Sequence, residues 1–188
     1  EQQDSVQSEP LQIRLAVPES VQETGWWCGP AALQMVLGYY GLSFSQQQLS
    51  DLMHTSPVTG TEYEDLAAAA TELIFAQTGR SGQYTSVILT SADSHLRAEF
   101  EERALQDLKA GSPVFAAVNN AQMYQNTADQ VHQTVIYGVD INEEGKAERW
   151  YYLDPSASRT SEYGQKYWCT ADELWNAMIN SPEPGYVW

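Results

Sequence analysis

The chain has 188 residues, 43% of them hydrophobic and 11% aromatic, which is enough to bury a core within one domain. Its 25 acidic and 9 basic residues give a formal net charge of −16, which argues against binding to nucleic acid or to an anionic membrane surface. This charge is compatible with cationic peptide substrates, but we interpret it as a solvated acidic shell.

The composition predicts a short leader followed by a single domain. Residues 1–10 are polar and acidic and are expected to be a flexible N-terminal leader, with the domain over residues 11–188. The most apolar stretch, residues 26–42, contains Gln34 and several glycines, so no membrane insertion is expected. The chain begins at Glu1, which fits a mature bacterial protein, secreted or at the cell surface, whose signal segment is absent from this chain. We expect a monomer.

The first expected element is a strand over residues 11–17, where apolar and polar side chains alternate. A loop over residues 18–27 leads to a helix that begins at Cys28. Pro30 belongs to its first turn, where the missing N–H of proline costs nothing, and Gly41 is typical of the residue that ends a helix.

The rest of the first half is predicted to be mostly helical. Two helix starts have the spacing of a capping box, namely Ser45 with Gln48 and Thr61 with Glu64. The next expected elements are a strand over residues 84–89 and a helix over residues 96–110.

The second half is predicted to be an antiparallel, strand-rich unit. Branched and aromatic residues indicate strands over residues 114–118, 132–139 and 150–153, with a hairpin turn over residues 142–145. A last helix follows the capping box of Thr170 and Glu173. Together the two halves indicate the α+β class.

Cys28 is the first candidate for chemistry. At a helix N-terminus the partial positive charge favours the thiolate, which is the reactive form of cysteine. Two alternatives remain open. Cys28 can pack in the core as a small hydrophobic side chain, or it can form a disulfide with Cys169, the other cysteine of the chain, which would leave no nucleophile.

A thiol nucleophile needs a base, and the chain has three histidines. His54 and His95 lie at expected helix ends, where surface or capping roles are usual, whereas His132 begins an apolar strand. Asp154 follows the strand expected to pair with it and can orient the imidazole, although an aspartate before proline is also common in turns. Asp140, at the far end of the His132 strand, is the weaker candidate.

Gln22 lies in the loop before the Cys28 helix. Its amide can donate to a developing oxyanion together with the backbone N–H of Cys28, or it can be an ordinary loop residue. Trp26, Trp27 and Tyr124 can line a cleft, but aromatic residues are equally common in cores.

These residues resemble the papain-like cysteine peptidases and, within them, the bacterial double-glycine leader peptidases in stand-alone form. The resemblance covers residues 17–155. The matching segments are residues 17–22, 27–33, 39–41, 60–61, 108–114, 132–138 and 153–155. Gln133 is more polar than this resemblance leads us to expect.

The resemblance implies a papain-like fold, in which a helical lobe carrying the nucleophile helix packs against an antiparallel β lobe. It implies Cys28 as nucleophile, His132 as general acid and base, Asp154 as the residue that orients it, and Gln22 as oxyanion donor. The expected function is hydrolysis of a peptide or isopeptide bond in a peptide or protein substrate through an acyl-enzyme, without a cofactor or a metal. The alternatives are an acyl or peptidyl transferase and an inactive papain-like binding module.

Overall fold

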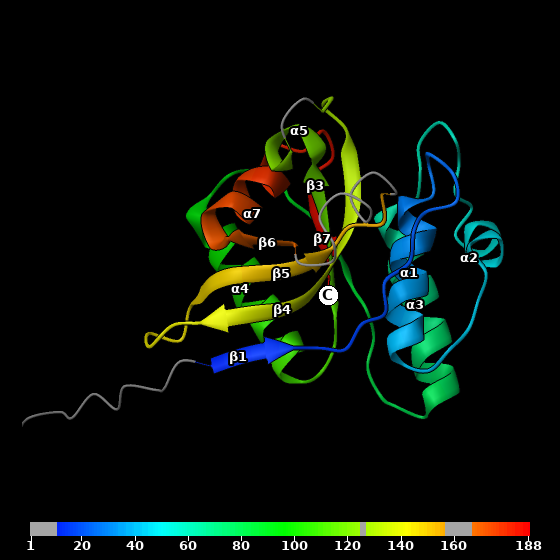
Figure 1. Cartoon of the computed structure of the whole chain (residues 1–188), viewed down its shortest axis with the longest axis horizontal. Coiled ribbons are helices and arrows are strands. Elements are labelled where there is room, and N and C mark those ends of the chain that lie inside the picture. Colours follow the sequence, from blue (N-terminus) through cyan, green and yellow to red (C-terminus); the bar gives the residue numbers. More distant parts are fainter. Residues whose placement is uncertain (1–10, 125–126, 157–166) are drawn as a thin grey trace, which may run out of the picture.

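The computed structural model describes residues 11–124, 127–156 and 167–188. The leader expected over residues 1–10 lies outside the described residues. Helices predominate in the first half of the chain and strands in the second, which confirms the α+β class. Figure 1 shows the sheet beside a group of helices that come from the first half. Within the described part of the chain, no helix is long and apolar enough to cross a membrane.

The helices of the first half lie together on one side of the sheet (Figure 1). They are α1 Cys28–Tyr39, α2 Gln46–Leu52 and α3 Tyr63–Thr78. The capping box expected at the start of α2 is confirmed. The Ser45 hydroxyl accepts the backbone N–H of Gln48, and the Gln48 side chain accepts the backbone N–H of Ser45.

The capping box expected at Thr61 is wrong. Helix α3 begins one residue later than a Thr61 cap would place it, and its N-cap residue, Glu62, makes no side-chain capping bond. The Thr61 hydroxyl instead pairs with the Thr55 hydroxyl at 2.8 Å. The Thr61 hydroxyl, which the sequence spacing predicted to cap the helix, is therefore used in a contact of the preceding loop.

The described strands form one sheet in which every pairing is antiparallel, as expected for the second half. They are β1 Leu11–Arg14, β2 Ser86–Ile88, β3 Val114–Asn119, β4 Val131–Ile141, β5 Ala147–Leu153, β6 Tyr167–Thr170 and β7 Gly185–Val187. The order is β2-β7-β3-β4-β5-β6, and β1 pairs with β4. Strands β6 and β7 have no counterpart among the expected elements.

The remaining helices of the described residues are α4 Ser94–Lys109, α5 Asn120–Met123 and α7 Ala171–Ile179. The capping box expected at Thr170 and Glu173 is present at the start of α7. The short helix α5 was not expected from the sequence. It follows β3 directly, with the Asn119 side chain accepting the backbone N–H of Ala121 as its cap.

Two hydrophobic clusters lie on opposite faces of the sheet. Side chains of α1 and α3 pack on one face against Phe115 and Val135. Side chains of α4 and α7 pack on the other face against Ile136 and Trp150. Because both faces are covered, β3 is buried along its whole length, and its sequence is continuously apolar up to Asn119 instead of alternating.

Candidate active site

Cys28 is the first residue of α1, and it lines one cavity with Val131 and His132, the first two residues of β4. No side chain caps this helix, so the positive end of its dipole faces the thiol without competition from a capping oxygen. The residue after Cys28 is Gly29, where Thr61 leaves no room for a side chain. A Cβ at Gly29 would lie 2.4 Å from Oγ1 of Thr61, so only glycine permits this approach between the helix start and the loop before α3.

His132 and Asp154 meet across neighbouring strands. His132 is the second residue of β4, and Asp154 comes directly after β5, which pairs with β4 so that Leu153 lies opposite Val135. The His132 Nε2 lies 2.5 Å from Oδ1 of Asp154, and both side chains are buried. This bond leaves the other ring nitrogen of His132 to serve the Cys28 thiol.

The Cys28 thiol and the His132 imidazole line the same cavity and shift each other's pKa. Burial alone would raise the pKa of Cys28, but the hydrogen bond and charge of His132, with the backbone N–H groups of Gln133 and Gly29, lower it below 9.0. Burial alone would lower the pKa of His132, but hydrogen bonds to Asp154 and Cys28 and their negative charges raise it from 6.5 to about 10. The pair therefore favours a thiolate beside an imidazolium.

Asp154 is fully buried and has three hydrogen-bond partners. Besides His132, it accepts the hydroxyl of Tyr124 at 2.5 Å on Oδ2 and the backbone N–H of Ser156 at 2.8 Å on Oδ1. Burial would raise the pKa of Asp154, but the hydrogen bond and charge of His132, followed by the bonds from Tyr124 and Ser156, lower it below 3.8. Asp154 is thus held as a carboxylate that stabilises a charged imidazole.

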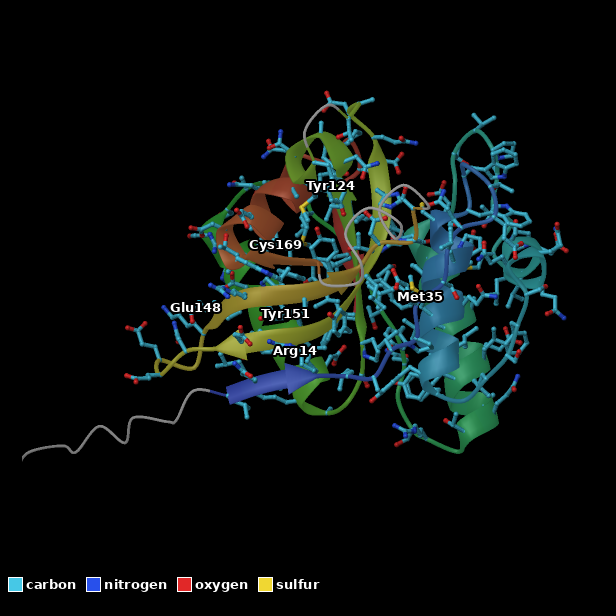
Figure 2. The ribbon with its side chains drawn as sticks, viewed as in Figure 1. Arg14, Met35, Tyr124, Glu148, Tyr151 and Cys169 are labelled. Atoms are coloured by element: carbon cyan, nitrogen blue, oxygen red, sulfur yellow. The ribbon has the colours of Figure 1, made fainter. Side chains whose placement is uncertain are left out.

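Tyr124 is a part of this site that the sequence reasoning missed, because it was considered only as an aromatic lining. It lies at the end of α5 (Figure 2), and its hydroxyl also approaches that of Tyr152 at 3.3 Å. Burial and then the charge of Asp154 raise the pKa of Tyr124, which keeps the hydroxyl protonated as a donor. The sequence held one local sign of this role, which is the position of Tyr124 between β3 and the loop that leads to His132.

The backbone of Gln22 is bonded to the residue that follows Asp154. Its N–H donates to the carbonyl oxygen of Pro155 at 2.8 Å. Its side-chain Nε2 donates to the carbonyl oxygen of Thr24 at 2.8 Å. An amide nitrogen has two N–H groups, so one donor remains beyond that bond. Gln22 is not among the residues that line the cavity at Cys28, and its role as oxyanion donor stays a prediction.

Cys28 and His132 open into a cavity of about 410 Å³. Trp26 and Val58 stand at its exposed rim, and Tyr63 and Gln133 lie on its buried side. The expected cleft aromatic Trp26 is therefore on this cavity, whereas Trp27 is not among its lining residues.

The other candidates lie apart from this cavity. His54 and His95 are exposed, and the carboxylate of Asp140 binds Arg14 at 2.6 Å and the hydroxyl of Tyr151 at 2.9 Å. Figure 2 shows the labelled Arg14 and Tyr151 on the part of the sheet that projects away from α1. Asp140 thus stabilises strand pairing in that region. Among the described residues, no group of His, Cys, Asp or Glu is arranged to hold a metal ion.

The two cysteines are not bonded to each other. Cys169 lies on β6 opposite Trp150, within the cluster that packs under α7 (Figure 2). Burial, with a smaller effect of Glu173, raises the pKa of Cys169 to about 12. Cys169 is therefore an inert core thiol, and the bridge considered from the sequence is not present.

These pKa directions predict how the two thiols react with pH. Alkylation of Cys28 by iodoacetamide should reach half its maximal rate below pH 9.0, because the thiolate forms as the pH rises through the lowered pKa. His132→Ala should move this midpoint to higher pH, since it removes the hydrogen bond and charge that lower the Cys28 pKa. Rates are measured by mass spectrometry of the two cysteine-containing peptides.

Two controls accompany this alkylation experiment. Cys169 reports unfolding, because it should stay unlabelled wherever the protein is folded. His95→Ala, at an exposed helix start, should leave the Cys28 midpoint unchanged. If the Cys28 midpoint is equal in wild type and His132→Ala, the imidazole does not activate the thiol.

Comparison with known proteins relates this chain to a family of peptidases and to solved structures. The model of the Peptidase_C39 like family matches residues 14–182. No curated protein matches the chain. A C39-like peptidase from Bacillus anthracis superimposes with a TM-score of 0.58 at 15% identity, over 94% of this chain and 96% of that one.

Two further solved structures show the same fold. A double-glycine-motif protease from an AMS/PCAT transporter, solved with the leader peptide, has a TM-score of 0.55 at 16% identity, over 94% of this chain and 96% of that one. The bromelain protease of Ananas comosus, solved with the inhibitor E64, has a TM-score of 0.56 at 14% identity, over 94% of this chain and 97% of that one.

Proposed function

The chain belongs to the peptidase C39-like family and has a papain-like cysteine peptidase fold, and from this premise we propose that it cleaves peptide or isopeptide bonds with Cys28 as nucleophile. The observation that carries this proposal is Cys28 at a helix N-terminus, on one cavity with His132, whose imidazole is hydrogen-bonded to Asp154. The leader peptide bound to a structural neighbour supports a peptide as substrate.

In the proposed reaction, the Cys28 thiolate attacks the carbonyl carbon of the substrate. The negative charge that develops on the carbonyl oxygen is stabilised by the backbone N–H of Cys28 and the free N–H of Gln22. The His132 imidazolium then gives its proton to the leaving amine, and an acyl-enzyme forms on Cys28. Neutral His132 next takes a proton from water, which attacks the thioester and releases a carboxylic acid and the thiol.

Asp154 keeps His132 ready for both proton transfers. Its carboxylate accepts a hydrogen bond from Nε2, which fixes the tautomer and the ring orientation and stabilises the imidazolium. Tyr124 and Ser156 in turn hold the carboxylate. The buried groups behind the reacting thiol therefore need little rearrangement during the reaction.

The test is a peptide-library assay in heavy-oxygen water, read by mass spectrometry. We expect cleaved peptides whose new carboxyl termini carry the heavy oxygen, because water resolves the acyl-enzyme. Rapid acid quenching should reveal an acyl adduct on the peptide that contains Cys28. If an added amine is incorporated in place of heavy oxygen, the enzyme is a transferase. If neither an adduct nor a cleaved peptide forms across the library, the proposed function is wrong.

A further inference from the structure

Gln133 lies in the cavity beside Cys28, on the helix side of the sheet. In antiparallel strands, residues directly opposite each other point to the same face. Gln133 lies opposite Ala117, and Ala117 lies opposite Gly185, so these three form a row across β4, β3 and β7. The ring of Tyr63, from α3, packs against Gly185 so closely that a Cβ there would lie 2.5 Å from it. Gln133 therefore points to the face that Tyr63 covers.

The side-chain amide of Gln133 has one hydrogen bond within the described residues. The residue is 5% exposed and lines the same cavity as Cys28, and its backbone N–H helps to lower the pKa of the Cys28 thiol. Its Nε2 makes one long hydrogen bond, 3.4 Å to the carbonyl oxygen of Thr134. Within the described part of the chain, no group donates to its Oε1. Oε1 is not fully enclosed by protein, so it stays accessible from the cavity and can accept a hydrogen bond from a ligand there.

The surroundings of this oxygen are acceptors and negative charges. Glu183 lines the same cavity, and the Tyr63 hydroxyl is already used, because it donates to the backbone carbonyl of Glu183 at 2.5 Å. Burial, followed by the negative charges of Glu183, Cys28 and Glu62, raises the pKa of Tyr63. The potential at this side of the cavity is therefore negative.

A second hollow, of about 480 Å³, continues the cavity past Tyr63 and Glu183, which line both. Its other lining residues include three carboxylates, from Glu62, Glu64 and Asp65. None of the described residues that line either hollow is a lysine or an arginine. The side of the cavity at Glu183 and the second hollow thus present carboxylates without a lysine or an arginine, which favours a ligand group that brings positive charge and hydrogen-bond donors.

We propose that this part of the cavity is a specificity pocket for a lysine or arginine side chain of the peptide substrate. The proposal rests on the proposed function and names its substrate class. The cationic head donates to Oε1 of Gln133 and pairs with the carboxylate of Glu183, both close to the thiol that attacks the backbone. A leucine in place of the lysine could not donate to Oε1 or pair with Glu183, and a glutamate would be repelled.

The test measures peptide binding to the Cys28→Ala protein, which is independent of cleavage. Three fluorescent peptides of identical sequence carry lysine, leucine or glutamate at one position, and the position is scanned through the peptide. At the position that enters the pocket, we expect lysine to bind about tenfold more tightly than leucine, and glutamate to bind most weakly. The preference for lysine should shrink at high salt.

Variants in the same background assign the effect to residues. Gln133→Leu and Glu183→Gln should each bring the lysine and leucine peptides to within about threefold of each other. Glu144→Gln, the same change as Glu183→Gln in the exposed turn between β4 and β5, should leave the preference intact. Glu183 is exposed, so Glu183→Gln keeps the test valid if Gln133→Leu does not fold.

The outcomes separate this inference from the proposed function. Equal binding of the three peptides at every position, no binding at all, or an unchanged preference in Glu183→Gln would each overturn the specificity pocket. The same peptides are then offered to the wild type. A lysine preference without cleavage contradicts only the proposed peptidase activity, and cleavage without the preference contradicts only the pocket.

Discussion

Cys28→Ala is expected to lower kcat/KM for peptide cleavage by at least ~10,000-fold, because the change removes the proposed nucleophile and with it the covalent pathway. Alanine is the best helix former, and Cys28 is the first residue of α1. The fold should therefore persist. The measurement is the cleavage rate of a library-identified peptide, with circular dichroism of both proteins to confirm folding.

Cys169→Ala is the matched control for that change. Its thiol is buried opposite Trp150, and its raised pKa keeps it protonated and unreactive. We expect a modest loss of stability, on the order of 1 kcal/mol for the small void, and an unchanged kcat/KM. A Cys28→Ala protein that still cleaves, or a Cys169→Ala protein that is folded and does not, would contradict the assignment of the nucleophile.

Asp154→Ala is expected to lower kcat/KM by roughly 1,000-fold to 10,000-fold. Without the carboxylate, His132 loses the acceptor of its Nε2 proton and the charge that raises its pKa. The neutral imidazole is then free to adopt the wrong tautomer, and the Cys28 pKa should rise because its partner is less positive. The change should appear both in the cleavage rate and in the pH midpoint of Cys28 alkylation.

Asp140→Ala is the control, since this aspartate also carries a charge pair on β4 but lies at the far end of the strand. Its loss removes the contacts with Arg14 and Tyr151 and should lower the free energy of unfolding without changing the alkylation midpoint of Cys28. If Asp154→Ala is folded and retains the midpoint and the rate of the wild type, Asp154 does not orient His132.

Several features of the fold could be predicted because their signals are local. The helix from Cys28, the capping boxes at Ser45 and Thr170, and the strand that begins near His132 each depend on residues within one or two turns of each other. The antiparallel pairing of β4 with β5 was also predictable, because a short turn joins them.

Other features depend on partners far away in the chain and had no local signal. Strands β6 and β7 are short, and β7 gains its place by pairing with both β2 and β3. The hydroxyl of Thr61 was assigned to a cap, but a loop contact uses it. The hydroxyl of Tyr124 reaches Asp154, 30 residues later, which no sequence spacing indicates.

The sequence by itself determined which residue types stand at the helix start and the strand ends, and therefore the candidates Cys28, His132 and Asp154, because capping and periodicity are short-range properties. Only the tertiary structure decided that His132 interacts with both of the others, that Cys169 and Cys28 are not bonded to each other, and that Gln133 lies in the cavity. Strand register and packing across the sheet create those contacts, and they depend on the whole chain folding together.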